Sequence, residues 1–276
     1  MRLLPALRIF SLCLFLAVTA CSAGHKRLSI HDRPAVADMT AALGQVQVVF
    51  IGEFHDQRDH HRLQLELIKE LYSQGKKLAI ALEMFDLEKQ HILDERVRGE
   101  TPLKEFVARY QKGWSINWAE YDSIMLFARN NRIQLVALDT PPDIVKQVTY
   151  KGAGALGHEA LRRLPANITT EMLPSYRKFM STAFRTHDIP DFMFDNFCSA
   201  QGLRNSTMAE RIAGFLTENP QKTVIVIAGV GHVMRRAVPS FLTKRGIAHK
   251  IVIPKVAGLY EELSGDDMDY FVSFEE

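Results

Sequence analysis

The chain has 276 residues, of which 47% are hydrophobic, and its formal net charge is +2. This length allows a large buried core in one domain, or in one domain with a smaller subdomain. A charge so close to neutral gives no sign of a nucleic-acid-binding surface, so we expect no nucleic-acid partner.

The N-terminus has the features of a secretion signal. Arg2 and Arg8 precede an apolar stretch at residues 9–18, which is too short to span a bilayer as a mature helix. We expect a signal peptide at residues 1–20, cleaved after Ala20. The sequence Val-Thr-Ala-Cys at residues 18–21 resembles a bacterial lipobox, so Cys21 is the predicted lipidation site. A lipidated Cys21 anchors a protein to a membrane surface without spanning it. The alternative is a plain signal peptide with a chance cysteine.

The remaining cysteines and the next residues agree with this placement. Cys13 leaves with the signal peptide, so Cys198 is the one thiol left and no internal disulfide is expected. Cys198 is predicted to be a small buried hydrophobe. Residues 21–40 are predicted to be a lipidated N-terminus and a polar tether. Because Ser22 stands where an aspartate often retains lipoproteins at the inner membrane, we expect a cell-envelope protein anchored at the outer membrane.

Apolar runs rich in valine and isoleucine predict the strands of a sheet. They lie at residues 46–51, 78–82, 132–138, 223–228 and 250–253. Their spacing exceeds that of hairpins, so helices must cross between them. Residues 58–73 have such a helical pattern and end just before Gly75. The sequence therefore predicts an α/β fold at residues 41–276, with a parallel sheet flanked by helices.

The strand signal disappears between residues 138 and 223. Helical patterns interrupted by prolines occupy this gap, and a second helical stretch follows residue 87. We interpret them as a smaller inserted helical subdomain at about residues 89–130 and 143–200.

Polar side chains follow three of the predicted strands. Glu53 and His55 come after the first strand, Glu83 ends the second, and His232 follows a glycine after the fourth. Because the carboxyl ends of parallel strands lie at one edge of a sheet, these four side chains are expected to converge. Each of them could instead be an ordinary polar loop residue.

Two chemistries fit this group of residues. Imidazoles and carboxylates are ligands for zinc, manganese or iron, and an open coordination position would activate water. The two glutamates could alternatively serve as a general base and an orienting group. His60 and His61, at the start of the next helix, are weaker candidates for ligands. Either chemistry would make the protein a hydrolase.

Four motifs taken together resemble the ChaN family of bacterial haem-binding lipoproteins. They are Gly-Glu-Phe-His-Asp at residues 52–56, Leu-Glu-Met-Phe at 82–85, Ala-Gln-Gly-Leu-Arg-Asn at 200–205 with Met-Ala-Glu at 208–210, and Ala-Gly-Val-Gly-His-Val at 228–233. That family belongs to a superfamily with the Tiki and TraB proteases and the erythromycin esterases. The resemblance implies a haem bound by a tyrosine at a homodimer interface, with histidine and lysine holding the propionates. Asn205 departs from the pattern, which commonly has an acidic residue there.

The helical insertion contains candidates for haem binding. A phenolate oxygen suits ferric iron, and Tyr176 lies among phenylalanines and methionines, so it is our first choice as iron ligand. Tyr150 is the second choice. Lys178 and His187 are the expected partners of the propionates. The alternative is that the aromatic and methionine side chains simply form a core.

These observations predict a haem-binding lipoprotein that acts in haem or iron uptake rather than an enzyme. Its expected partners are haem, a second copy of the chain, the membrane through its lipid, and an outer-membrane haem receptor. The dimer could form only when haem bridges the two copies. The alternative is a metal-dependent peptidase or esterase that uses Glu53, His55, Glu83 and His232 with a divalent metal.

Overall fold

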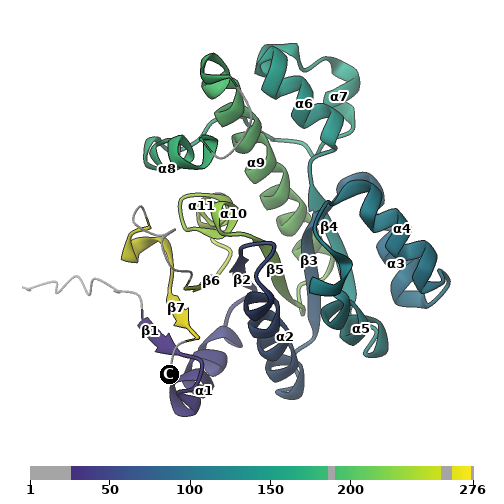
Figure 1. Cartoon of the computed structure of the whole chain (residues 1–276), viewed down its shortest axis with the longest axis vertical. Coiled ribbons are helices and arrows are strands. Elements are labelled where there is room, and N and C mark those ends of the chain that lie inside the picture. Colours follow the sequence, from purple (N-terminus) through teal and green to yellow (C-terminus); the bar gives the residue numbers. More distant parts are fainter. Residues whose placement is uncertain (1–25, 186–189, 256–262, 275–276) are drawn as a thin grey trace, which may run out of the picture.

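The computed structural model describes residues 26–185, 190–255 and 263–274. Within them, one parallel sheet has the strand order β1-β7-β6-β2-β5-β3-β4 (Figure 1). The strands are β1 Lys26–Ser29, β2 Val48–Glu53, β3 Leu78–Asp86, β4 Gln134–Asp139, β5 Thr223–Gly229, β6 His249–Pro254 and β7 Tyr270–Ser273. The predicted α/β fold with a parallel sheet is confirmed.

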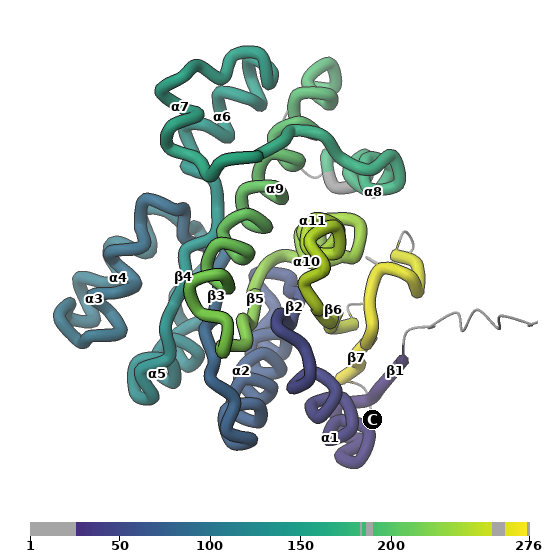
Figure 2. Tube along the Cα trace, turned by 180° about the vertical axis from the view of Figure 1, so that it is seen from behind, coloured from purple at the N-terminus to yellow at the C-terminus, as the bar shows by residue number. Residues whose placement is uncertain are grey.

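Helices cover both faces of this sheet. One face carries α1 Arg33–Leu43, α2 Arg58–Ser73, α3 Gln90–Arg98, α4 Leu103–Gly113 and α5 Asp122–Asn130. The other face carries α9 Phe194–Glu218, α10 Val230–Val233 and α11 Val238–Lys244, as the reverse view in Figure 2 shows. Short 3₁₀ turns lie at Leu87–Lys89, Trp118–Glu120, Ala153–Ala155, Asp191–Met193 and Gly265–Asp267.

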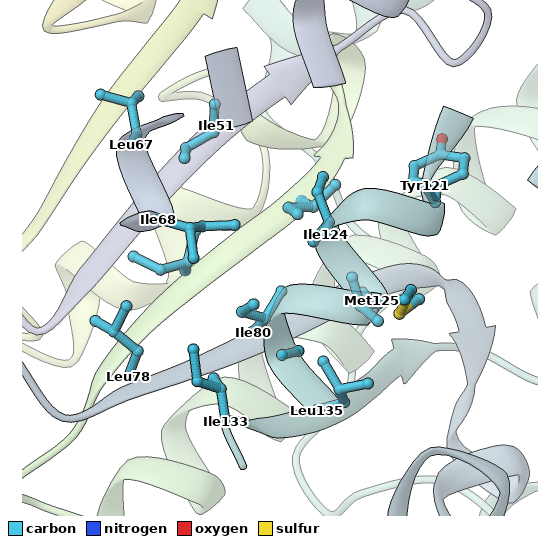
Figure 3. Packing of buried hydrophobic residues seen from close by; sticks show 14 of the residues in the cluster. Ile51, Leu67, Ile68, Leu78, Ile80, Tyr121, Ile124, Met125, Ile133 and Leu135 are labelled. Carbon is cyan, nitrogen blue, oxygen red and sulfur yellow. The ribbon is translucent and has the colours of Figure 1, made fainter. Parts of the chain in front are cut away.

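The strands are apolar throughout because both of their faces are buried. In β2, Val49 and Ile51 point into the core under α2 and α5, whereas Val48 and Phe50 point into the core under α9. This alternation follows from the two-residue period of a strand. Figure 3 shows the first of these cores, where Ile51 and Ile80 of the sheet meet Leu67 and other helical side chains.

The helical insertion is formed by α6 Pro142–Lys151, α7 His158–Arg162, α8 Pro174–Phe184 and the first part of α9. It has two small apolar clusters of its own, separate from the cores on the sheet. The earlier helical stretch behaves differently, since α3, α4 and α5 pack directly on the sheet. The predicted helical insertion is therefore confirmed, and it is the later of the two helical stretches.

The structure corrects the predicted tether at residues 21–40 in the part that it describes. Residues 26–29 form β1, which pairs in parallel with β7, and α1 begins at Arg33. The four-residue β1 gains its hydrogen bonds from a strand about 240 residues away, so no local pattern predicts it.

The signal peptide and Cys21 lie outside the described residues. Within the described ranges, none of the helices is long and apolar enough to cross a membrane. Cys198 is buried, as predicted.

Candidate functional site

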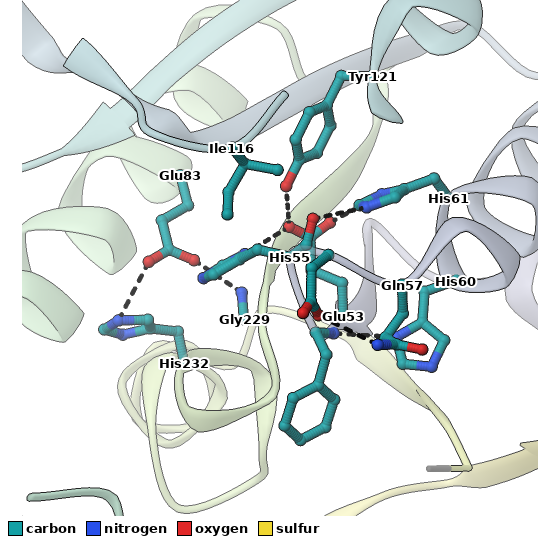
Figure 4. Close-up of polar contacts among 12 residues, drawn as sticks. Glu53, His55, Gln57, His60, His61, Glu83, Ile116, Tyr121, Gly229 and His232 are labelled. Atoms are coloured by element: carbon teal, nitrogen blue, oxygen red, sulfur yellow. Dashed lines mark hydrogen bonds and ion pairs between the residues drawn. The ribbon is translucent and has the colours of Figure 1, made fainter. Parts of the chain in front are cut away.

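The ends of three neighbouring strands bring the predicted polar residues together. β5 lies between β2 and β3 in the sheet, and Gly229 at its end lies opposite Glu53. Glu83 of β3 accepts a hydrogen bond from the Gly229 N–H at 2.7 Å, and its other oxygen lies 3.4 Å from His232 Nε2 (Figure 4). His55 lies 2.7 Å from Glu53. The predicted convergence of these four side chains is therefore observed.

The missing side chain at Gly229 allows the close approach of His55 to Glu83. A Cβ atom at this position would lie 3.1 Å from His55 Cε1 and 3.6 Å from Glu83 Oε2. The imidazole ring thus rests against the backbone of β5. Its opposite edge packs on Trp114, with ring centroids 5.0 Å apart.

Glu53 and His55 form an oriented carboxylate–imidazole pair. The buried Glu53 carboxylate also accepts hydrogen bonds from Gln64 Nε2, at 2.8 Å, and from the Tyr121 hydroxyl. Because a carboxylate only accepts, His55 carries its proton on Nδ1, and Nε2 is left to act as an acceptor. Burial lowers the pKa of His55, but the hydrogen bond to Glu53 and the charges of Glu83 and Glu53 outweigh it, so the pKa is raised above 6.5.

Glu83 is held in its charged form inside the protein. Burial alone would raise the pKa of its carboxyl group, but His232, Arg204, His55 and the Gly229 N–H outweigh burial and lower the pKa to about 2. Arg204 donates to Glu83 at 2.7 Å. The carboxylate therefore stays ionised at all physiological pH values.

Arg204 of α9 joins two strand ends. Its Nη2 also donates to Asp139 Oδ2 at 2.6 Å, and its Nε donates to Asp139 Oδ1 at 2.9 Å. Asp139 does not cap α6, because that helix begins at Pro142 with Pro141 at the capping position. Its carboxylate binds Arg204 instead.

The three buried histidines of this region are engaged in hydrogen bonds. His232 Nδ1 lies 2.6 Å from Asn205 Oδ1, and burial lowers the pKa of His232 to about 4. His60 Nδ1 accepts from the Phe54 N–H at 2.9 Å, and burial, with the nearby His61, lowers its pKa to about 4. His61 contacts the Gln64 side chain at 3.1 Å. His60 and His61 therefore hold the loop after β2 in place.

The structure does not support the predicted divalent metal site. Among the residues that the structure describes, no group of three or more histidine, cysteine, aspartate or glutamate side chains could hold a metal ion. The reason lies in the partners of the carboxylates. Glu53 is bound by protein donors, and Glu83 is neutralised by a guanidinium.

A pH dependence of stability follows from the two histidines with lowered pKa values. Between about pH 6.5 and pH 4, His60 and His232 are protonated in the unfolded chain but neutral in the folded protein. The unfolded state therefore binds more protons, and the free energy of unfolding should fall as the pH falls. We expect His232→Gln to flatten this slope in urea denaturation at a series of pH values. The exposed His31 is the control, and His31→Gln should keep the wild-type slope. If wild type, His232→Gln and His31→Gln lose stability equally steeply as the pH falls, His232 does not cause the pH dependence.

The candidates for haem binding lie in the insertion. Tyr176 on α8 is 1% exposed, and within the described residues its hydroxyl has no hydrogen-bond partner. Burial raises the pKa of Tyr176, although Asn205 and Arg204 oppose this effect. The tyrosine therefore lies beside the charged residues at the strand ends.

The other candidates are more accessible or lie outside the described residues. Tyr150, near the end of α6, is 58% exposed, and Lys178 is exposed on α8. His187 falls outside the described residues. Two exposed apolar side chains, Phe192 at 81% and Leu173 at 40%, flank α8 in the sequence.

Sequence reasoning missed several members of the site. Tyr121 and Gln64 hold Glu53, but they occupy ordinary helical patterns that give no functional signal. Arg204 and Asn205 belong to the motif at residues 200–205, which indicated the place but not the contacts. The role of Gly229 depends on a spatial neighbour and is invisible in one sequence.

Comparison with known families decides what kind of protein this is. A family model described as "Haem-binding uptake, Tiki superfamily, ChaN" matches residues 39–249. The chain belongs to the ChaN family. The predicted resemblance is thereby confirmed, and the matched residues contain all four strand-end residues of the site.

Solved structures share the fold of this ChaN-family protein. The structure titled "Cofacial heme binding to ChaN of Campylobacter jejuni" has a TM-score of 0.66 at 17% identity, covering 85% of this chain and 90% of that one. The erythromycin esterase EreC, as a mutant in its open conformation, has a TM-score of 0.50 at 14% identity, covering 79% and 72%. The type III effector HopBA1 also gives 0.50, at 12% identity, covering 86% and 92%. At such identities these likenesses concern the fold alone.

A curated relative comes from a plant. The protein RETICULATA-RELATED 5, chloroplastic, of Arabidopsis thaliana is 24% identical over an alignment of 205 residues that covers 68% of this chain. The match spans only 27% of that protein's length.

Proposed function

We propose that this ChaN-family protein binds haem and acts in haem or iron uptake. Membership of a haem-binding family supports the ligand. Within the described residues, the observation that carries the proposal is the buried Tyr176 hydroxyl, which makes no hydrogen bond of normal geometry although Asn205 lies close enough to lower its pKa. Leaving a buried polar atom unpaired costs free energy, so such an atom calls for an explanation. Ligation of ferric iron would give the phenolate oxygen its partner.

The surroundings of Tyr176 fit an apolar ligand that carries acidic groups. Met180 and Phe184 are buried in the same cluster, with Phe179 packed against it. Lys178, exposed on the same helix, is our proposed partner for a propionate, and His187 remains a second proposed partner. Because solvent cannot reach the Tyr176 hydroxyl, α8 must move before haem can bind there.

Further proposals concern assembly and location. The exposed Phe192 and Leu173 offer apolar surface for a second copy, so we propose a homodimer with haem at its interface. Lipidation of Cys21 would place the protein at the outer membrane, where a haem receptor could exchange haem with it.

Substituting Tyr176 with phenylalanine tests the iron ligand. We expect Tyr176→Phe to lose the charge-transfer band of a ferric phenolate in an absorption titration with ferric haem. Its free energy of unfolding should stay within about 1 kcal/mol of wild type, because the hydroxyl makes no hydrogen bond of normal geometry within the described residues. Tyr150→Phe is the matched control and should keep the band. If Tyr150→Phe loses the band instead, Tyr150 is the ligand, and if both variants keep it, tyrosine ligation is wrong.

A second candidate function is hydrolysis by acid–base chemistry without a metal. The Glu53–His55 pair supports it, because Nδ1 is oriented by a carboxylate while the His55 side chain is 32% exposed. A cavity of about 210 Å³ is lined by Glu83, Trp114 and Arg204, among others, and Trp114 packs on His55, although His55 and Glu53 do not line the cavity themselves.

An ester or amide substrate screen separates the two functions. Under the hydrolase proposal, His55→Gln should lower kcat at least about 100-fold, the usual effect of losing a general base, and a metal chelator should have no effect. The same variant should bind haem as wild type does. Activity that survives in His55→Gln would overturn this candidate.

A further inference from the structure

Helix α8 lies across the segment that carries His232. A Cβ atom at Gly231 of α10 would lie 3.7 Å from Phe179 Cε1 and 3.7 Å from Met180 Cε, both on α8. Met234 and Ala237, which follow α10, are buried in the same cluster as Tyr176. Helix α8 therefore rests on the α10 segment, with the side chain of its own Tyr176 buried on the inner side.

Arg236 ties the first turn of α8 to the body of the protein, in addition to the ion pair between Arg177 of α8 and Asp195 of α9. Arg236 Nη1 donates to the backbone carbonyl of Ser175 at 3.0 Å, in the first turn of α8. The guanidinium also lies 5.8 Å from the centre of the Phe179 ring.

The other end of this link is fixed. Arg236 Nη2 donates to Asp267 Oδ2 at 2.9 Å. Asp267 is buried, and the same carboxylate oxygen accepts from the Ser264 N–H at 3.0 Å. Arg236 is therefore held on a rigid turn while it contacts α8.

We infer that α8 is a lid that holds its own Tyr176 against the body of the protein and that Arg236 is its latch, an inference that rests on the proposed haem binding. The lid packs through a small cluster that is separate from the two cores on the sheet, so it can open while the sheet stays folded. Haem binds the open form, and the fraction of open molecules sets the apparent affinity.

The test compares two adjacent arginines in the full-length protein. Arg236→Gln should raise hydrogen exchange of the amides at residues 174–184 about tenfold and speed haem association by a similar factor, the usual effect of losing a charge-assisted hydrogen bond. Arg235 is the matched control, because it donates to the Asp266 carbonyl at 2.8 Å and to Asp269 at 3.0 Å. Arg235→Gln should leave both quantities unchanged.

Two internal checks keep the outcomes distinct. Exchange in α2 should match wild type in every variant, which shows that the sheet stays folded. Arg236→Lys keeps the charge but cannot span both partners, so it should give an intermediate exchange rate. Unchanged exchange in α8 would overturn the latch, and faster exchange without faster haem association would overturn the lid. Absence of haem binding by the wild-type protein would instead overturn the proposed function, and the exchange data would still report whether α8 opens.

Discussion

Replacing Arg204 with methionine should lower the free energy of unfolding by about 3–5 kcal/mol. Arg204 is 15% exposed and neutralises two carboxylates at once, Glu83 at 2.7 Å and Asp139 at 2.6 Å. The substitution leaves both acids in the protein interior without their cation. Removal of one partner from a buried ionic group is costly because the remaining charge is neither solvated nor paired. Urea denaturation of the purified variant measures the loss.

An exposed arginine provides the control. Arg62 pairs with Asp59 at 3.2 Å, but both side chains are more than half exposed. Arg62→Met should therefore cost less than about 1 kcal/mol. Adding Glu83→Gln and Asp139→Asn to Arg204→Met should recover part of the stability, since the unpaired charges are then gone. If Arg204→Met costs no more than Arg62→Met, the buried network does not stabilise the fold.

The second large effect is expected at a glycine of the same helix. A Cβ atom at Gly202 would lie 2.3 Å from the Thr170 carbonyl oxygen and 2.7 Å from its carbon. Backbone atoms cannot rotate away as a side chain can, so α9 or the chain at Thr170 must shift. We expect Gly202→Ala to cost about 1–3 kcal/mol or more. Because Arg204 and Asn205 lie on the next turn, the shift should also disturb their contacts.

Helix α9 contains its own control for this substitution. Nothing lies within 4 Å of a Cβ atom at Gly214. Gly214→Ala should therefore stabilise the protein by up to about 1 kcal/mol, because alanine favours helix over glycine. Thermal unfolding of the two variants should shift Tm in opposite directions. A loss of similar size in both would mean that α9 tolerates no alanine for reasons other than the contact with Thr170.

The sequence predicts the buried part of the fold better than its edges. β2 and β5 are continuous apolar runs because they are covered on both faces, and this pattern is visible in a single chain. β1 and β7 have four residues each, and they form by pairing with other strands, β1 with β7 and β7 also with β6, which no local pattern reports. The segment before α1 therefore resembled a tether.

The same contrast holds for the site. Glu53, Glu83 and His232 could be placed from the strand ends that precede them. The charge state of Glu83 could not be predicted in the same way, because Arg204, which helps to keep the carboxylate charged, comes from α9, 121 residues away. The burial of Tyr176 is likewise a tertiary property, because it depends on how α8 rests on the α10 segment.

The strand order also constrains the order in which the molecule can be assembled. β2 pairs with β5 and β6, and β5 itself fills the place between β2 and β3. A growing chain that ends before residue 223 can pair β3 with β4, but β2 then has no neighbour and Glu83 lacks the Gly229 amide. Folding must wait for contacts between residues that are far apart in the sequence, which makes it slow. The sheet of this topology therefore cannot be completed before its C-terminal strands have been synthesised, because β5 lies in its middle.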